Sequence, residues 1–248
     1  MERRFARLIA AVGAAVLVTA ALTACGGGGG GGGDPTAQAP GASTTAAGGG
    51  ATGVTGDQAV ADRANLVIAD FPTEFKSTPL PADAAAVNAQ NDRDFADCMG
   101  RPRPEEIRTA SADSLDFSAA DTRRASSSVQ LVKTEDIAKD DFTALRTDKG
   151  SSCLQTQMDK EFARQLPVSG PQTKTGIEKF DLPQFGDDTV AYRVTATGTV
   201  DAQQVITIID LVFVRKGRTQ ISGAFINRTL PFPQDLEKTL LQRMVGRA

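Results

Sequence analysis

The chain contains no histidine among its 248 residues, and this absence argues against several classes of enzyme. Catalytic systems built on Ser-His-Asp or Cys-His, histidine general bases and histidine-containing zinc sites all require an imidazole. The sequence also lacks Gly-x-Ser-x-Gly, Ser-x-x-Lys, a Walker loop and a Gly-x-Gly-x-x-Gly motif after a strand. We therefore expect a non-enzymatic protein without a cofactor or a metal site.

Aromatic residues and clustered basic residues are also scarce. There is no tryptophan and one tyrosine, the net charge is −3, and Lys and Arg are scattered rather than gathered into a stripe. Nucleic-acid binding normally requires a basic surface with interleaved aromatic side chains. We therefore expect no nucleic-acid partner.

The N-terminus has the pattern of a targeting signal. Arg3, Arg4 and Arg7 precede an apolar run from Leu8 to Leu22, which is shorter than the roughly 20 residues of a membrane-spanning helix. The run ends in Leu-Thr-Ala-Cys25, which resembles the lipobox of bacterial lipoproteins. In that family the cysteine receives a diacylglycerol and becomes the N-terminus after cleavage. The resemblance implies a signal peptide over 1–24 and a lipid anchor at Cys25 on the extracytoplasmic face of the cell membrane.

A low-complexity segment follows the cysteine. Glycine fills positions 26–33, and Gly, Ala, Thr, Ser, Pro and Gln dominate as far as residue 56. Such a composition cannot bury enough apolar surface to offset the entropy of ordering. The sequence predicts a disordered tether over 25–64 and one globular domain over 65–248.

Two cysteines remain in the predicted domain, Cys98 and Cys153. An even number of cysteines outside the cytoplasm favours a disulfide between them. Two buried free thiols and a redox pair are the alternatives.

Apolar spacing predicts helices first and strands last. Helical periods occur over 81–99, 135–145 and 151–166, and a terminal helix begins near Pro233. Strands are predicted over 127–133, 177–182, 190–200, 205–214 and 219–227, with a hairpin at Lys216-Gly217. Consecutive strands with short turns indicate an α+β domain with an antiparallel sheet flanked by helices.

Several short motifs together resemble one family. They are the lipobox, Asp70-Phe71-Pro72, Phe95-x-x-Cys98-x-Gly100, Cys153-Leu154 and the closing strand meander with its helix. This arrangement resembles actinobacterial envelope lipoproteins of the LpqN type and the extracytoplasmic sensor domain of the kinase PknH. The resemblance implies a PsbP-like fold, a twisted antiparallel sheet flanked by helices. It implies no catalytic residue.

Asp210 lies in the middle of a predicted strand, on the face that carries Ile206, Ile208, Val212 and Val214. A buried carboxylate needs a partner or a raised pKa, and either can mark a functional site. Arg193 on the preceding strand is the candidate cross-strand partner. The alternative is an aspartate that is paired for stability or exposed at a sheet edge.

Two hypotheses for function follow from these patterns. The first is a binding or accessory module for an apolar or cell-envelope ligand, or for an envelope protein, with Tyr192, Phe213 and Phe225 as candidate ligand-lining residues. The second is a carboxylate-based hydrolase acting on cell-wall polysaccharide, which needs two acids across a cleft. Its candidate acids are Asp92, Asp94, Asp97, Asp187 and Asp188. A cavity of a few hundred Å³ between sheet and helices would favour the first.

Overall fold

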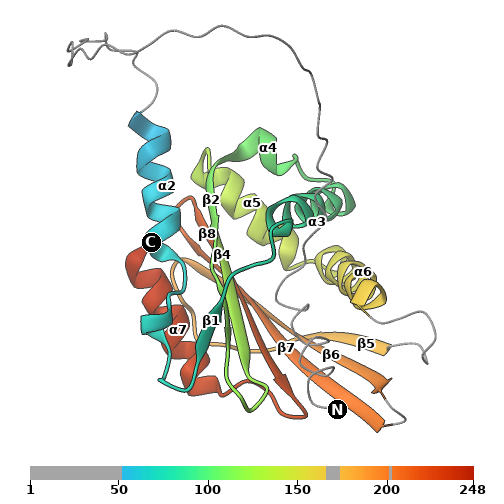
Figure 1. The fold of residues 1–248 in the computed structure, drawn as a ribbon. Coiled ribbons are helices and arrows are strands. Elements are labelled where there is room, and N and C mark those ends of the chain that lie inside the picture. Colours follow the sequence, from blue (N-terminus) through green and yellow to red (C-terminus); the bar gives the residue numbers. More distant parts are fainter. Residues whose placement is uncertain (1–51, 166–173, 201–202) are drawn as a thin grey trace, which may run out of the picture.

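The computed structural model describes residues 52–165, 174–200 and 203–248. The predicted signal peptide (1–24), Cys25 and the tether as far as residue 51 lie outside this part of the chain. The described residues form an α+β fold in which helices flank an open, eight-stranded antiparallel sheet (Figure 1). The predicted fold class is confirmed.

The elements run in the following order. The first half contains α2 (Thr52–Ala64), a 3-10 turn η1 (Ile68–Asp70), β1 (Lys76–Thr78), α3 (Ala84–Met99), α4 (Pro104–Ile107), β2 (Arg108–Asp113), β3 (Asp116–Ser118) and β4 (Arg124–Val132). The second half contains α5 (Glu135–Leu145), α6 (Asp148–Gln165), β5 (Lys174–Lys179), β6 (Asp188–Val200), β7 (Gln203–Lys216), β8 (Thr219–Arg228) and α7 (Gln234–Arg247).

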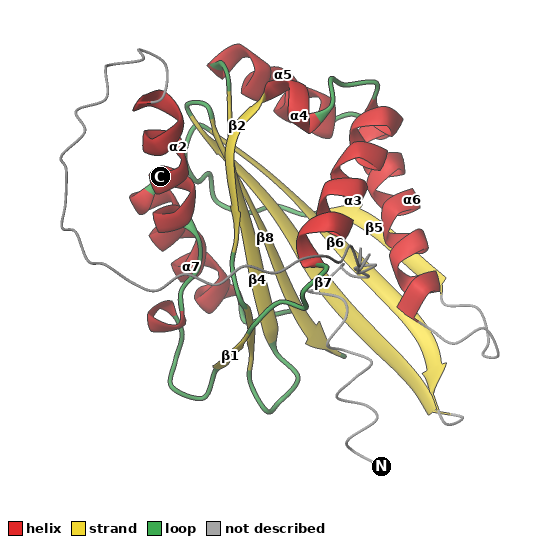
Figure 2. Ribbon diagram, turned by 45° about the horizontal axis from the view of Figure 1, so that its top comes forward, coloured by secondary structure: helices red, strands yellow, loops and turns green. Residues whose placement is uncertain are grey.

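The sheet has the order β1-β3-β4-β8-β7-β6-β5, and β2 pairs with the remaining part of the β4 edge. The predicted apolar strand, β7, lies centrally and is antiparallel to both β6 and β8. Helices α2 and α7 cover one face of the sheet, whereas α3, α5 and α6 lie on the other face (Figure 2).

Local signals explain where the helices on the second face begin and end. The Thr134 side chain accepts a hydrogen bond from the backbone N–H of Ile137 and thereby caps α5. Helix α3 ends at Gly100, which adopts the left-handed conformation with φ 68° and is followed by Pro102. The sequence predicts this start of α5 and this end of α3, whereas α3 begins at Ala84 rather than at residue 81.

The face covered by α2 and α7 is densely packed. Val129 from β4, Val212 from β7 and Phe225 from β8 are fully buried against Leu240 and Leu241 of α7. Side chains alternate along each strand, so the neighbouring positions point to the other face. On that face Phe142 of α5 and Leu154 of α6 pack against Val190 and Tyr192 of β6.

The predicted boundary between tether and domain is wrong. Residues 52–64 were assigned to a disordered tether, but they form α2, which packs on β2, β4 and α7. Ala61 and Ala64 are completely buried there. The helix lacks large apolar side chains, so its stability depends on close contact through alanines and on Asp57, which is bonded to Arg218 and Thr109.

Candidate ligand cavity

A cavity of about 540 Å³ lies between the sheet and the helices of the second face. Its floor is formed by β4, β8 and β7, and α3 and α6 form its walls. In Figure 2 these two helices lie side by side over that face. A volume of this size is within the range of small-molecule binding sites in proteins.

The floor of the cavity is hollow because small side chains line it. Ser126 and Ser128 of β4 pair in register with Ala224 and Ser222 of β8, so all four project toward α3. On the opposite face the same two strands carry large buried side chains, including Val129 and Phe225. The sheet is therefore filled on one side and recessed on the other.

The wall toward β7 and α6 is largely apolar. Leu211 and Phe213 contribute from β7, and Phe95 and Met99 contribute from α3. The remaining apolar side chains come from α5 and α6, namely Phe142, Leu145, Leu154 and Met158. This wall offers an apolar molecule a surface against which it can leave water.

A chain of hydrogen-bonded polar side chains crosses the opposite end of the cavity. Arg108 contacts Asp92 at 2.5 Å and donates to Gln130 at 2.9 Å. Gln130 donates to Gln220 at 2.6 Å, and Gln220 donates to Asp141 at 2.9 Å.

Arg101 completes this chain with a bond of 2.9 Å to Asp141. All six side chains line the cavity, and their two arginines and two aspartates balance in charge. The cavity thus joins an apolar wall to a polar end whose side chains are held in fixed positions.

Of the three candidate ligand-lining residues, only Phe213 lines this cavity. The prediction for Phe225 is wrong. This residue pairs in register with Asp210 and so lies on the opposite face of the sheet, where it is fully buried. The centre of its ring lies 5.4 Å from the centre of the Phe232 ring. The prediction for Tyr192 is also wrong, because this residue does not line the cavity. It shares the face of Phe213 but is fully buried beneath α5, where its hydroxyl donates to the Leu145 carbonyl. Burial raises the pKa of the Tyr192 phenol.

The structure pairs Asp210 with Arg193, as the sequence predicts. The two residues lie opposite each other on β7 and β6, and Arg193 Nε and Nη2 contact the two carboxylate oxygens at 2.7 and 2.8 Å. The Arg193 guanidinium also lies 4.7 Å from the centre of the Phe180 ring. This pair is on the α7 face and does not line the cavity.

Glu237 of α7 lies beside this ion pair and was missed by the sequence reasoning. It is 1% exposed. Burial is the main cause that raises the pKa of Glu237 to about 8, and the neighbouring Asp210 carboxylate is the second. The protonated carboxyl can donate to Asp210, which is fully buried. The predicted charge site is therefore an Arg193–Asp210–Glu237 cluster that joins α7 to the sheet.

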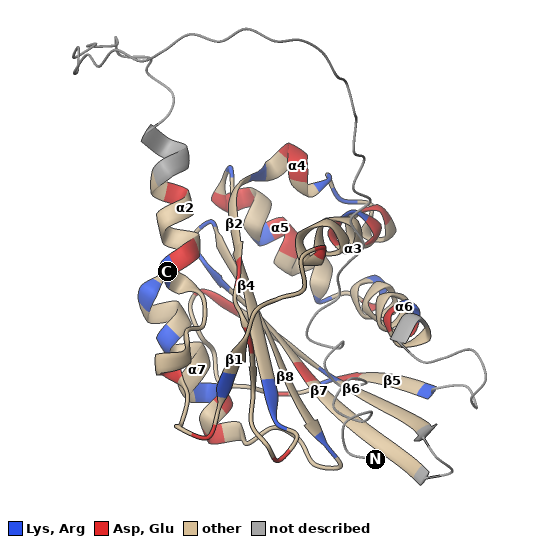
Figure 3. Cartoon of the chain, in the orientation of Figure 1, with Lys and Arg blue, Asp and Glu red and all other residues tan. Residues whose placement is uncertain are grey.

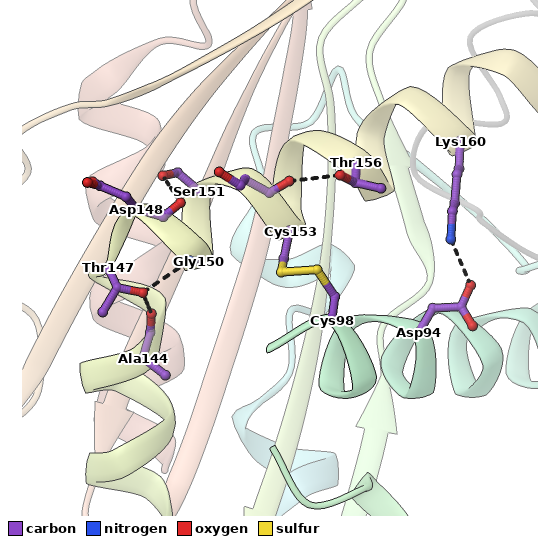
Figure 4. Close-up of a disulfide and its surroundings, with 11 residues drawn as sticks. Asp94, Cys98, Ala144, Thr147, Asp148, Gly150, Ser151, Cys153, Thr156 and Lys160 are labelled. Carbon is purple, nitrogen blue, oxygen red and sulfur yellow. Dashed lines mark hydrogen bonds and ion pairs between the residues drawn. A yellow bond between two sulfur atoms is a disulfide. The ribbon is translucent and has the colours of Figure 1, made fainter. Parts of the chain in front are cut away.

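The disulfide between Cys98 and Cys153 is present, with an S–S distance of 2.02 Å (Figure 4). It joins the C-terminal turn of α3 to the first part of α6, so it connects two walls of the cavity. An ion pair of 3.4 Å between Lys160 and Asp94 links the same helices farther along (Figure 4). The two helices thus form one covalently linked cover.

The acids proposed for a hydrolase are each in contact with a cation. Asp92 pairs with Arg108, Asp94 with Lys160 and Asp97 with Arg103, and both Asp187 and Asp188 pair with Arg215. Within residues 52–165, 174–200 and 203–248 there is no group of three or more His, Cys, Asp or Glu side chains that could hold a metal ion. None of the helices in these ranges is long and apolar enough to span a membrane.

The polar chain along the cavity was not predicted. Its clearest sequence signal is the alternation along β4, where Ser126, Ser128 and Gln130 alternate with Ala125, Val129 and Leu131. Arg101, Arg108 and Asp141 come from separate elements, and no local pattern indicates that these residues meet.

Comparisons with protein-family models, with curated proteins and with solved structures find no match for this chain. The resemblance to LpqN-type lipoproteins therefore stays a prediction from the sequence motifs.

Proposed function

We propose that this protein is a membrane-anchored, extracytoplasmic lipoprotein of the LpqN type whose domain binds an apolar or amphipathic cell-envelope molecule without transforming it. The observation that carries this proposal is the cavity of about 540 Å³ between the sheet and helices α3 and α6. A cavity with an apolar wall and a few fixed polar groups is the usual form of a small-molecule site.

The anchoring part of the proposal rests on the sequence. The basic start, the apolar run and Leu-Thr-Ala-Cys25 support cleavage before Cys25 and lipidation of its thiol. A diacylated cysteine holds a protein on a membrane stably, whereas a single acyl chain holds it only marginally. The Cys98–Cys153 disulfide supports an oxidising compartment.

The cavity wall also supports binding rather than chemistry. Of the four acids that line the cavity, Asp92 and Asp141 are bonded to Arg108 and Arg101, and Asp113 is bonded to Asn88. Such groups orient a ligand through hydrogen bonds, and the apolar wall supplies the area that a ligand buries.

Native mass spectrometry of protein expressed in a related bacterium tests the proposal. The wild-type chain should carry a co-purifying small molecule, and Ser222→Phe, which places a ring on the cavity floor, should lose it. Ser77→Phe is the matched control, because Ser77 is exposed on β1 outside the cavity lining. An additional mass retained equally by Ser222→Phe and by wild type, or no additional mass in the wild type, would overturn the proposal.

A further inference from the structure

Exposed apolar side chains gather around one short segment of the surface. In the described part of the chain, the exposed large apolar residues are Val67, Ile68 and Leu115, each 45% exposed, and Leu230, which is 66% exposed. Val67 and Ile68 are adjacent, at the beginning of the η1 turn that follows α2. Leu230 lies elsewhere, in the loop between β8 and α7.

Leu115 is held beside this segment by shared hydrogen bonds. The Leu66 backbone N–H donates to Ser127 Oγ, and Ser127 exchanges two bonds of 2.8 Å with Ser114, which precedes Leu115. Asn65 also donates to the Ala112 carbonyl at 2.7 Å. The β2–β3 turn is therefore fixed to the chain around Val67, and we refer to Val67, Ile68 and Leu115 as the apolar patch.

Arginines of α7 and α2 border the apolar patch on the side of the η1 segment. Arg243 donates to the Asp70 carbonyl at 2.7 Å, and Arg247 donates to the Asn65 carbonyl at 2.7 Å, so both hold the ends of the η1 segment. Arg63, which is exposed at the end of α2, donates to the Arg247 carbonyl at 2.8 Å. Figure 3 shows basic positions along α7 beside the end of α2.

The acidic group at this segment faces inward. Asp70 is 6% exposed and contacts Arg247 at 2.8 Å and Arg243 at 3.8 Å. The Arg243 side chain is 45% exposed despite these contacts, which leaves its guanidinium accessible at the rim. Two exposed acids nearby each accept a hydrogen bond from an amide: Asp62, beside Arg63 on α2, from Gln58, and Asp113, two residues before Leu115, from Asn88.

We propose that the apolar patch, with Arg63 and Arg243 at its rim, is a docking surface for an anionic phospholipid bilayer. Aliphatic side chains bordered by arginines suit the headgroup region, where apolar groups leave water and arginines meet phosphates. A bilayer matches both the exposed aliphatic side chains of the patch and the arginines beside them.

The position of the patch in the chain fits this occupant. Residues 26–51 separate Cys25 from α2, and their contour length is at most ~90 Å. This is long enough for the patch to reach the membrane that holds the proposed lipid. The proposal therefore rests on the anchoring part of the proposed function and does not depend on ligand binding in the cavity.

The absence of tryptophan from the chain makes a direct test possible. Full-length protein carrying Ile68→Trp is reconstituted with vesicles of phosphatidylglycerol and phosphatidylcholine with brominated acyl chains, which quench indole fluorescence on contact. The sole indole should lose about half or more of its emission, because docked side chains reach the acyl boundary. Leu230→Trp is the matched control and should keep its emission.

Further variants separate the components of the surface. Val67→Asp added to Ile68→Trp should abolish the quenching, and Arg63→Gln should weaken it in anionic vesicles. High salt should also weaken it, because the arginines act through the surface potential of the membrane.

Three outcomes are decisive. Quenching of Ile68→Trp alone supports docking. Equal quenching of Ile68→Trp and Leu230→Trp, or none in either, in protein that sediments with the vesicles overturns docking and leaves the anchor intact. Protein that stays in the supernatant overturns both the anchor and the docking surface.

Discussion

Glu237 shows how a single buried carboxyl controls the attachment of an element. It lies on α7 against Asp210 of β7 and near Arg193 of β6, and Lys238 is the neighbouring charge on its own helix. Burial and the Asp210 carboxylate both favour its neutral form, which explains why its pKa is raised from 4.5 to about 8. At neutral pH the helix is therefore attached through a protonated acid.

The raised pKa has a consequence for stability. Between pH 4.5 and about 8 the folded state keeps a proton that the unfolded state has lost. The free energy of unfolding therefore falls as pH rises through this window, by at most about 1.4 kcal/mol per pH unit. The contribution is complete below the unfolded pKa and is lost as pH rises through the folded pKa.

Glu237→Gln should remove this pH dependence, because an amide can donate to Asp210 without ionising. We expect the variant to be more stable than wild type at pH 8, by about 2–4 kcal/mol, and to show a flatter profile from pH 5 to 8. Urea unfolding at several pH values measures the difference. An unchanged slope in the variant would contradict the assignment.

The phenylalanines show what the sequence conveys at the scale of a residue. Phe213 and Phe225 are both apolar residues in predicted strands, yet one lines the cavity and the other lies in the packed core. The difference depends on strand register, which pairs Phe225 with Asp210 and Phe213 with Ser222. Register is a tertiary property, so the sequence predicted the strands but not which phenylalanines line the cavity.

At the scale of elements, strongly periodic segments were predictable and weakly periodic ones were not. Helix α5 was predicted with its bounds, Glu135–Leu145, because Ile137, Phe142 and Leu145 recur at helical spacing. Short strands β1, β2 and β3 were not predicted, since each depends on pairing with a distant edge. Helix α2 was missed because buried alanines and the Asp57–Arg218 pair stabilise it.

Helix α3 depends more on its covalent link than the other helices do. Its main packing partner is α6, and toward the sheet it covers a cavity rather than a filled core. The disulfide at its C-terminal turn closes a loop with a sequence separation of 55 residues. Restricting a loop of this length in the unfolded chain stabilises the folded state by about 4 kcal/mol at most.

The double substitution Cys98→Ser/Cys153→Ser should therefore lower the free energy of unfolding by about 2–4 kcal/mol. It should also accelerate amide hydrogen exchange in α3 far more than in α7, which packs on the filled face. Urea unfolding and hydrogen exchange measure the two effects, and wild-type protein under reducing conditions is the control. Equal acceleration in α3 and α7 would show that the bond supports the whole fold rather than the cover.

On the scale of the whole molecule, one face of the sheet is closed by dense packing, and the other is packed over β6 but open over β4 and β8. Helices α2 and α7 fill the first with completely buried side chains, among them Ala61, Leu240 and Met244. On the second, α3 and α6 leave the serine-lined hollow of β4 and β8. A molecule that enters the cavity would therefore stabilise α3 and α6 directly, and it would affect α2 and α7 only through the sheet.

This asymmetry predicts where a ligand acts. An apolar probe, 8-anilinonaphthalene-1-sulfonate, at 100 times its dissociation constant should raise the free energy of unfolding by about 2.7 kcal/mol. For amides that exchange through local openings, protection should increase in α3, β4 and β8, because these elements line the cavity. Protection of such amides should remain unchanged in α7, which does not line it. Ser222→Phe should lose this local protection while Ser77→Phe retains it. Protection that instead appears in α7 would place the binding site on the closed face.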